Sequence, residues 1–117
     1  MIDGIGTDII SFDKIRRYCG KKYFLERIFT KRERDYAESR HDRLAHLAAT
    51  FAAKEAVFKA LGTGWRDPQN IEIIRNKSGK PEVRISGRLK RLMKNRKALV
   101  SLSYCSNFAV AFAAIKK

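Results

Sequence analysis

One stretch of the chain, Phe51–Gly64, carries residue types that can hold and neutralise phosphate groups. On a helix, which turns by about 100° per residue, Glu55 falls inside an apolar stripe and Lys59 follows one turn later on the same side. The stripe consists of Leu44, Leu47, Ala48, Phe51 and Phe58. A carboxylate on a core-facing side is costly unless a cation, a metal ion or hydrogen-bond donors compensate it. Because the helix then ends at Gly-Thr-Gly, where a ligand can approach the backbone closely, the stretch predicts a phosphate and metal site.

A second acid, Asp8, lies near the N-terminus. Met1–Ile10 alternates as a strand does, with Met1, Ile5 and Ile9 on one face and Gly4, Gly6 and Asp8 on the other. If this strand lies beside the long helix, Asp8 and Glu55 come together, and two carboxylates with open coordination positions suit Mg²⁺. Zinc is not expected, because no Cys or His has ligand spacing. Two simpler interpretations stay open: the glycines serve packing alone, and Glu55 with Lys59 forms an ordinary surface ion pair.

The elements that would position these residues follow from periodicity and capping signals. Helices are predicted from Ser11 through Tyr18, from Lys31 to about Arg40, from near Asp42 to Gly62, and over Arg88–Asn95. Strands are predicted at Met1–Ile10, Ile71–Arg75, Glu82–Ile85, Ala98–Tyr104 and Phe108–Ile115. Thr30 and Glu33 fit a capping box at the start of the second helix, and Ser86 is a candidate cap for the last one. This order predicts one α+β domain over residues 1–117, with a mostly antiparallel sheet packed on one long helix.

The last predicted strand has two different apolar faces. Phe108, Val110 and Phe112 alternate with Ala109, Ala111 and Ala113. Since both faces are apolar, both should be covered, and the smooth alanine face suits a closely packed helix or a neighbouring subunit.

The composition indicates a folded, basic protein with an acidic partner. Lys and Arg number 26 against 12 Asp and Glu, for a net charge of +14, and 44% of residues are hydrophobic, which argues against disorder. The two cysteines form neither a zinc pattern nor a disulfide framework. No stretch is apolar enough to span a bilayer and the N-terminus does not resemble a signal peptide, so we expect a cytoplasmic protein without a membrane partner.

Three motifs, in order and well separated, carry a family resemblance: GIGTDI at Gly4–Ile9, FAAKEAVFKALGTG at Phe51–Gly64 and SGKP at Ser78–Pro81. They resemble the bacterial holo-acyl-carrier-protein synthases, which are small homotrimeric 4′-phosphopantetheinyl transferases. The resemblance extends over the whole chain, including the terminal hairpin. It implies a homotrimer that transfers phosphopantetheine from coenzyme A to a serine of apo-acyl carrier protein, in support of fatty acid biosynthesis.

The resemblance also implies residue roles. Asp8 and Glu55 match the family's metal-binding acids, and Lys59 matches the lysine that contacts the phosphates. Gly62, Thr63 and Gly64 match the loop that lines the coenzyme, while Ser78, Gly79, Lys80 and Pro81 match the segment near its adenosine and 3′-phosphate. Lys14, Arg17 and Lys21 match the surface on which the acidic carrier protein docks. Electrostatic complementarity of this kind acts mainly on association rate and orientation.

Two positions depart from the family pattern. Thr50 stands where relatives often carry arginine, so a phosphate contact is expected to be missing or supplied elsewhere. Tyr104 stands where many relatives have a histidine that is a candidate base for activating the serine. A tyrosine with an ordinary pKa of about 10 is a poor base at neutral pH. Glu55, Asp8 through a metal-bound water, and a group on the partner are the open alternatives for the proton acceptor.

Two other kinds of protein are alternatives to a Mg²⁺-dependent transferase. A small basic RNA-binding protein would show basic strands interleaved with aromatic residues, whereas the strands here are apolar on both faces, so no nucleic acid partner is expected. A non-catalytic trimer that binds coenzyme A would keep the nucleotide-binding segments without needing Glu55 and Lys59 to be chemically competent.

Overall fold

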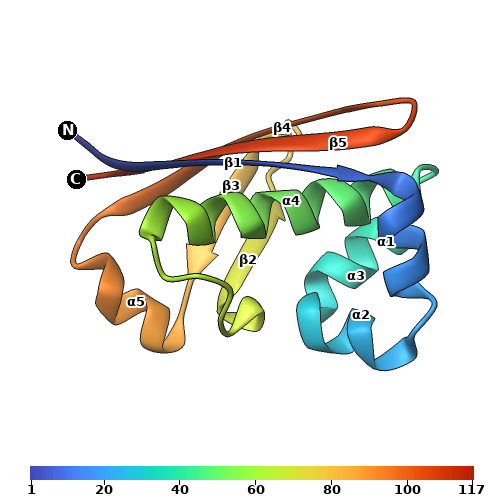
Figure 1. Ribbon diagram of the computed structural model, residues 1–117, viewed down its shortest axis with the longest axis horizontal. Coiled ribbons are helices and arrows are strands. Elements are labelled where there is room, and N and C mark those ends of the chain that lie inside the picture. Colours follow the sequence, from blue (N-terminus) through green and yellow to red (C-terminus); the bar gives the residue numbers. More distant parts are fainter.

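The computed structural model describes residues 1–117 and contains two antiparallel sheets flanked by helices (Figure 1). The larger sheet has the strand order β1-β5-β4, made of β1 (Ile2–Ser11), β5 (Phe108–Lys116) and β4 (Lys97–Cys105). The smaller sheet pairs β2 (Ile71–Arg75) with β3 (Pro81–Ile85). The predicted α+β class with antiparallel strands is therefore confirmed.

Helix α4 (Arg43–Leu61) lies along the inner face of the larger sheet, beneath β1 and β5 (Figure 1). Its central alanines, Ala52, Ala53 and Ala56, are fully buried, as are Ala109 and Ala113 of β5. The alanine face of β5 is thus covered by a helix of the same chain. This is one of the two arrangements expected from its smooth surface, and it leaves the bulky face of β5 pointing outward.

The glycines of β1 allow this strand to lie directly on the backbone of α4. A Cβ atom on Gly4 would overlap the carbonyl oxygen of Ala60. A Cβ atom on Gly6 would overlap the carbonyl oxygen of Ala56 and lie 2.8 Å from the Ala60 nitrogen. The two glycines therefore serve packing, as the simpler interpretation held, and the same contact carries Asp8 to the surface of the helix.

The remaining helices cover the two ends of α4 (Figure 1). One end carries α1 (Phe12–Cys19), α2 (Lys22–Ile28) and α3 (Lys31–Glu38), and α5 (Gly87–Met93) lies toward the other. The β2–β3 hairpin lies between them, behind the middle of α4 in this view. Ser11 caps α1 by accepting a hydrogen bond from the Lys14 amide at 3.1 Å, and both bonds of the Thr30–Glu33 capping box are present. None of these helices combines the length and apolar character needed to cross a membrane.

Three local predictions differ from the structure. Helix α2 was not expected, because Lys21 precedes it and provides no side-chain cap. Helix α5 ends at Met93 and not near Asn95, since Lys94 and Asn95 adopt positive φ angles of 49° and 69°. Ser86 occupies the position before α5 but makes no capping hydrogen bond.

The close contact between β1 and α4 predicts that Gly6→Ala lowers the free energy of unfolding by about 1–3 kcal/mol, because the new methyl group must push the strand away from the helix. Urea denaturation measures this loss. Gly20→Ala is the matched control, since Gly20 has a right-handed φ of −68° and its Cβ would lie 3.4 Å from the nearest atom. Its effect should stay below about 1 kcal/mol. Equal stabilities of the two variants would contradict the contact.

Candidate active site

The contact of β1 with α4 brings Asp8 and Lys59 together. The Nζ atom of Lys59 lies 3.1 Å from Oδ1 of Asp8 and donates a hydrogen bond to the carbonyl oxygen of Thr7 at 2.9 Å. The Asp8 side chain is 16% exposed and that of Lys59 is 52% exposed, so the pair lies at the surface with its acid partly enclosed. An acid and a cation far apart in the sequence thus meet where the strand crosses the last turns of the helix.

Glu55 lies one helical turn before Lys59 and is half-buried. Burial is the main cause that raises the pKa of Glu55 above its ordinary value, and the negative charge of Asp8 raises it further. The positive charges of Lys59 and Lys14 act in the opposite direction. The structure therefore places the two predicted acids within electrostatic reach of each other. A pKa perturbed by burial together with a specific charged partner is a common property of functional sites.

Asp8 and Glu55 are the residues at this position that can hold a metal ion. Two neighbouring carboxylates whose charges repel each other provide oxygen ligands, which suit a hard divalent cation. No group of three or more His, Cys, Asp or Glu residues is arranged to hold a metal on its own. The donor set therefore fits a cation that completes its coordination with water and with oxygen atoms of a ligand.

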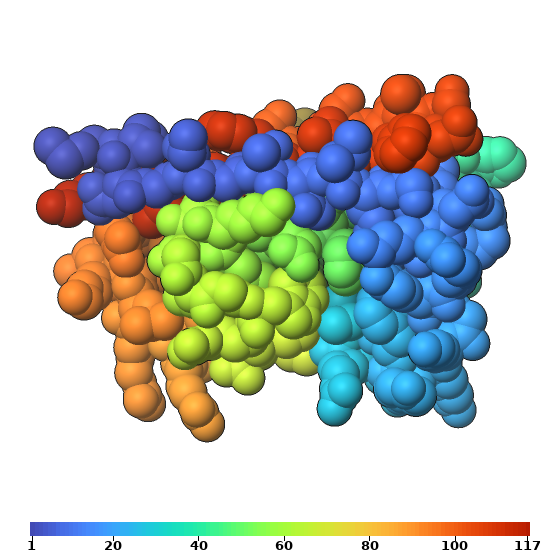
Figure 2. Space-filling view, viewed as in Figure 1, coloured from blue at the N-terminus to red at the C-terminus, as the bar shows by residue number.

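The Gly62–Gly64 loop begins three residues after Lys59 and is open to solvent. Gly62 ends α4 with a left-handed φ of 74°, and Gly64 has a φ of 68°. A Cβ atom on either glycine would meet no atom within 4 Å, so the loop has free space around it. Figure 2 shows the end of α4 and this loop, in yellow-green, exposed directly below β1.

Helix α1 borders the other side of the acid pair. Lys14, Arg17 and Lys21 are all exposed, and Lys14 is near enough to influence the pKa of Glu55. In Figure 2 the blue α1 surface lies to the right of the green and yellow-green surface of α4 and the segment after it, beneath the same strand. A basic helix thus stands next to the two acids.

The segment Ser78–Pro81 lies elsewhere in the single chain. It forms the β2–β3 turn, in which Oδ1 of Asn76 accepts hydrogen bonds from the Ser78 amide, the Ser78 hydroxyl and the Lys80 amide. Lys80 and Pro81 line a cavity of about 660 Å³ with residues of α5 and β4, among them Met93, Arg96 and Lys97. None of the hydrogen bonds or ion pairs of this turn reaches Asp8, Glu55 or Lys59. The turn thus has no direct polar contact with these three residues within the chain.

The two departures from the family pattern also lie away from the acid pair. Thr50 is 8% exposed, so it presents no phosphate-binding group at the surface. The Tyr104 hydroxyl lies 3.5 Å from Oδ2 of Asp42, and its ring packs against those of Phe12 and His46. Tyr104 lines a separate cavity of about 650 Å³, shared with Arg16, His41 and Arg43.

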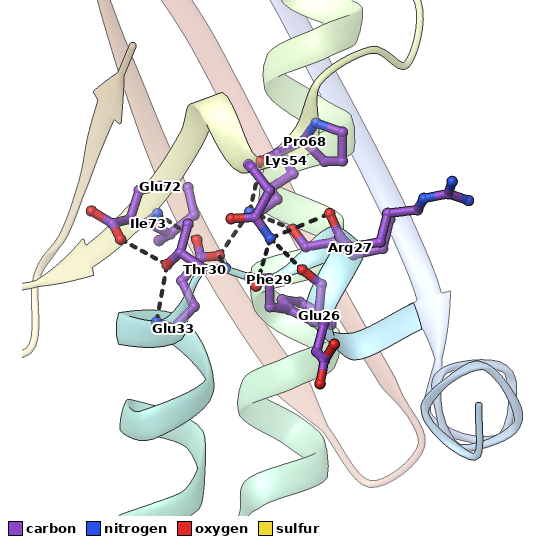
Figure 3. A network of polar contacts seen from close by, with 11 residues as sticks. Glu26, Arg27, Phe29, Thr30, Glu33, Lys54, Pro68, Glu72 and Ile73 are labelled. Atoms are coloured by element: carbon purple, nitrogen blue, oxygen red, sulfur yellow. Dashed lines mark hydrogen bonds and ion pairs between the residues drawn. The ribbon is translucent and has the colours of Figure 1, made fainter. Parts of the chain in front are cut away.

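The most deeply buried charge in the chain, that of Lys54, was not predicted from the sequence. Lys54, beside Glu55 in α4, is 0% exposed and forms an ion pair of 2.7 Å with Glu33, whose side chain is 1% exposed (Figure 3). The charged residue fully inside the core is thus Lys54, while Glu55 is only half-buried. A signal was present in the sequence: Lys54 follows Phe51 by three residues and precedes Phe58 by four, which places it beside the apolar stripe of the helix.

Comparisons with known proteins show the family of the chain. The model of the 4′-phosphopantetheinyl transferase superfamily matches residues 4–113. The chain is 47% identical to the holo-[acyl-carrier-protein] synthase of Protochlamydia amoebophila, over 94% of each chain.

Solved structures show the same fold. The crystal structure of holo-[acyl-carrier-protein] synthase from Neisseria meningitidis has a TM-score of 0.91 and 34% identity, with 100% of both chains covered. The enzyme of that name from Bacillus anthracis, solved in complex with CoA (3′,5′-ADP), has a TM-score of 0.86 and 34% identity over 100% of this chain and 98% of its own. The chain therefore belongs to the 4′-phosphopantetheinyl transferase superfamily and is a transferase.

Proposed function

We propose that the protein transfers 4′-phosphopantetheine from coenzyme A to a serine of an apo-acyl carrier protein. The observation that carries this proposal is the cluster of Asp8, Glu55 and Lys59, formed where β1 crosses α4 beside an open glycine loop. The similarity to named holo-[acyl-carrier-protein] synthases, one of them solved with CoA (3′,5′-ADP), supports the choice of donor and acceptor. The reaction would support fatty acid biosynthesis in the cytoplasm.

The reaction exchanges one phosphorus–oxygen bond for another. The serine oxygen forms a bond to the phosphorus next to the pantetheine arm, the pyrophosphate bond breaks, and adenosine 3′,5′-bisphosphate leaves. Such transfers depend mainly on positioning and on neutralising charge. Lys59 reaches the phosphates from the end of α4 and offsets charge that develops on the leaving group.

Asp8 and Glu55 would hold Mg²⁺ in this reaction. When bound, Mg²⁺ neutralises and orients the pyrophosphate oxygens. The donor set supports this assignment, because the charge of Asp8 raises the pKa of Glu55 and a cation between the two carboxylates removes that repulsion. The Gly62–Gly64 loop, three residues beyond Lys59, would line the coenzyme.

The outer face of the larger sheet supports a homotrimer. Its side chains point away from α4 and leave an exposed apolar surface formed by Ile5, Ile9, Leu99, Phe108, Val110 and Phe112. A surface of this kind on a small protein marks a protein–protein interface. The alanine face of β5 gives no such support, because α4 covers it. Assembly through the outer face would let Ser78–Pro81 of one chain complete the site that another chain begins with Asp8 and Glu55.

One assay tests the proposed function. Purified protein, coenzyme A, Mg²⁺ and an apo-acyl carrier protein are incubated, and the intact mass of the carrier is measured. We expect the mass gain of one phosphopantetheine group, loss of transfer when Mg²⁺ is chelated, and a light-scattering mass of three chains. No mass gain with several carriers, under conditions in which a known synthase modifies them, would refute the function.

Glu55→Gln should abolish transfer while making the metal-free protein more stable at pH 7. Because the pKa of Glu55 is raised on folding, its contribution to stability is most favourable below its ordinary pKa of 4.5 and declines as pH rises through the folded-state value. Glutamine does not ionise, so the variant avoids the loss of stability that ionisation of Glu55 causes. Thermal unfolding from pH 4 to pH 8 should therefore show a stabilisation that grows with pH, and a variant less stable than the parent at pH 7 would contradict the electrostatic account.

Charge reversal on the basic surface formed by α1 and the residues that follow it tests whether the carrier protein docks there. Arg17→Glu combined with Lys21→Glu should raise the KM for the carrier protein by roughly tenfold at low salt and leave the KM for coenzyme A unchanged. The effect should shrink as salt is added. The matched control is Arg91→Glu with Lys117→Glu, which makes the same change in net charge at two exposed positions outside α1. If both pairs of substitutions raised the KM for the carrier protein equally, the carrier protein would not dock specifically at Arg17 and Lys21.

A further inference from the structure

Lys54 uses all three of its N–H donors inside the core. Its Nζ atom lies 2.7 Å from Oε1 of Glu33 and donates to the carbonyl oxygens of Ile28 at 2.8 Å and of Pro68 at 2.9 Å (Figure 3). These partners belong to three different parts of the chain: α3, the end of α2, and the segment that follows the glycine loop. A single side chain of α4 thus links these three segments to one another.

Glu33 holds the other side of this network. Its Oε1 accepts a hydrogen bond from the Thr30 amide at 2.9 Å, and its Oε2 accepts one from the Ile73 amide at 2.7 Å. Burial raises the pKa of Glu33 and lowers that of Lys54, while each residue's charge opposes the shift of the other. Removing Lys54 would leave the buried Glu33 carboxylate with its two amide donors but without its counter-charge. It would also take one donor each from the carbonyl groups of Ile28 and Pro68.

The segment from Gly62 to Pro68 is fixed at three points. Gly62 is bonded to the last turn of α4 through its amide, which donates to the Phe58 carbonyl at 2.9 Å. Trp65 packs its ring against Phe58 and Phe51, with centroid distances of 4.8 Å and 5.3 Å. Lys54 holds the far end through Pro68. The exposed Gly62–Gly64 loop lies between the first two points, and the stretch that continues it ends at a contact made in the core.

Gln69, the residue after Pro68, makes a second link between this part of the chain and the end of α2. Its side-chain amide donates to the carbonyl oxygens of Glu26 at 2.6 Å and Phe29 at 2.8 Å, at the end of α2. Gln69 is exposed, whereas Lys54 is fully buried, so the two links tie one segment to α2 from outside and from inside.

We propose that Lys54 is a positioning residue for the donor substrate: through Pro68 it holds the loop at Gly62–Gly64 in the conformation that binds coenzyme A. This rests on the proposed function, in which that loop lines the coenzyme. Lys54 touches no substrate in this role. Its neighbour Glu55 belongs to the acid pair, so two adjacent residues of α4 serve the site, one from the core and one from the half-buried surface.

The test uses Trp65, the single tryptophan of the chain, as a reporter of the segment. In Lys54→Met we expect the Trp65 emission to shift to longer wavelength and its anisotropy to fall. We also expect the equilibrium dissociation constant for coenzyme A, measured by calorimetry, to rise roughly tenfold or more. The KM for the carrier protein should not change. An unchanged Trp65 signal, or unchanged coenzyme A affinity, would overturn the proposal.

Two control variants separate positioning from lost stability. Lys54→Met with Glu33→Gln removes the buried carboxylate that has lost its counter-charge and should recover stability, but the bond from Lys54 to the Pro68 carbonyl stays absent. Coenzyme A affinity should therefore stay weak in this double variant, and recovery of affinity together with stability would overturn the proposal. Leu47→Ala creates a cavity two turns earlier in α4 and should lower stability without moving Trp65 or the affinity.

Gln69→Ala keeps the test decisive if the Lys54 variants do not fold. It removes the hydrogen bonds from the exposed Gln69 side chain to the end of α2. The Trp65 signal and the coenzyme A affinity should change in the same direction as in Lys54→Met, by a smaller factor. An unchanged signal and affinity would count against positioning by this segment. Because coenzyme A binding and Trp65 emission are read without turnover, failure of this proposal is distinguishable from failure of the transfer assay.

Discussion

The structure depends on the direct contact of the β1 backbone with the backbone of α4. Only glycine fits at positions 4 and 6, because a Cβ atom at either would overlap a carbonyl oxygen of the helix. This contact lets a strand and a helix approach more closely than side chains would permit. Asp8 follows the second glycine by two residues, on the same side of the strand, so it reaches the helix surface beside Glu55 and Lys59. The geometry of the site is therefore a consequence of packing.

Two adjacent residues of α4, Lys54 and Glu55, differ in burial and in the charges around them, and these differences suit a structural role for one and a chemical role for the other. Lys54 is fully buried and its charge is matched by Glu33 and by two carbonyl oxygens. Glu55 is half-buried, and the nearby acid Asp8 adds to the effect of burial on its pKa. A buried pair with matched charges is typical of a structural network, whereas two neighbouring acids near the surface provide oxygen ligands that suit a cation. The chain's membership in the transferase superfamily agrees with this division.

Local signals in the sequence predicted most of the elements. Ser11, the Thr30–Glu33 box and Gly62 marked helix ends that the structure contains, since each acts through bonds within a few residues. Helix α2 lacks such a cap and was not predicted. The partnership of Asp8 with Glu55 followed from assuming that the first strand lies on the long helix. The Lys54–Glu33 pair was missed, because it joins residues 21 apart whose meeting depends on how α2, α3 and α4 pack. The expected role of Ser78–Pro81 near the coenzyme stays a prediction.

The most direct test of the central claim is whether Asp8 and Glu55 form one cation site. The affinity for Mn²⁺ in the presence of saturating coenzyme A can be measured by electron paramagnetic resonance for the parent, Asp8→Asn, Glu55→Gln and the double variant. The account predicts that each single substitution weakens binding strongly and that the double variant binds little worse than either single one, because the two acids act on the same ion. Independent, additive losses, or undiminished binding in Glu55→Gln, would contradict it.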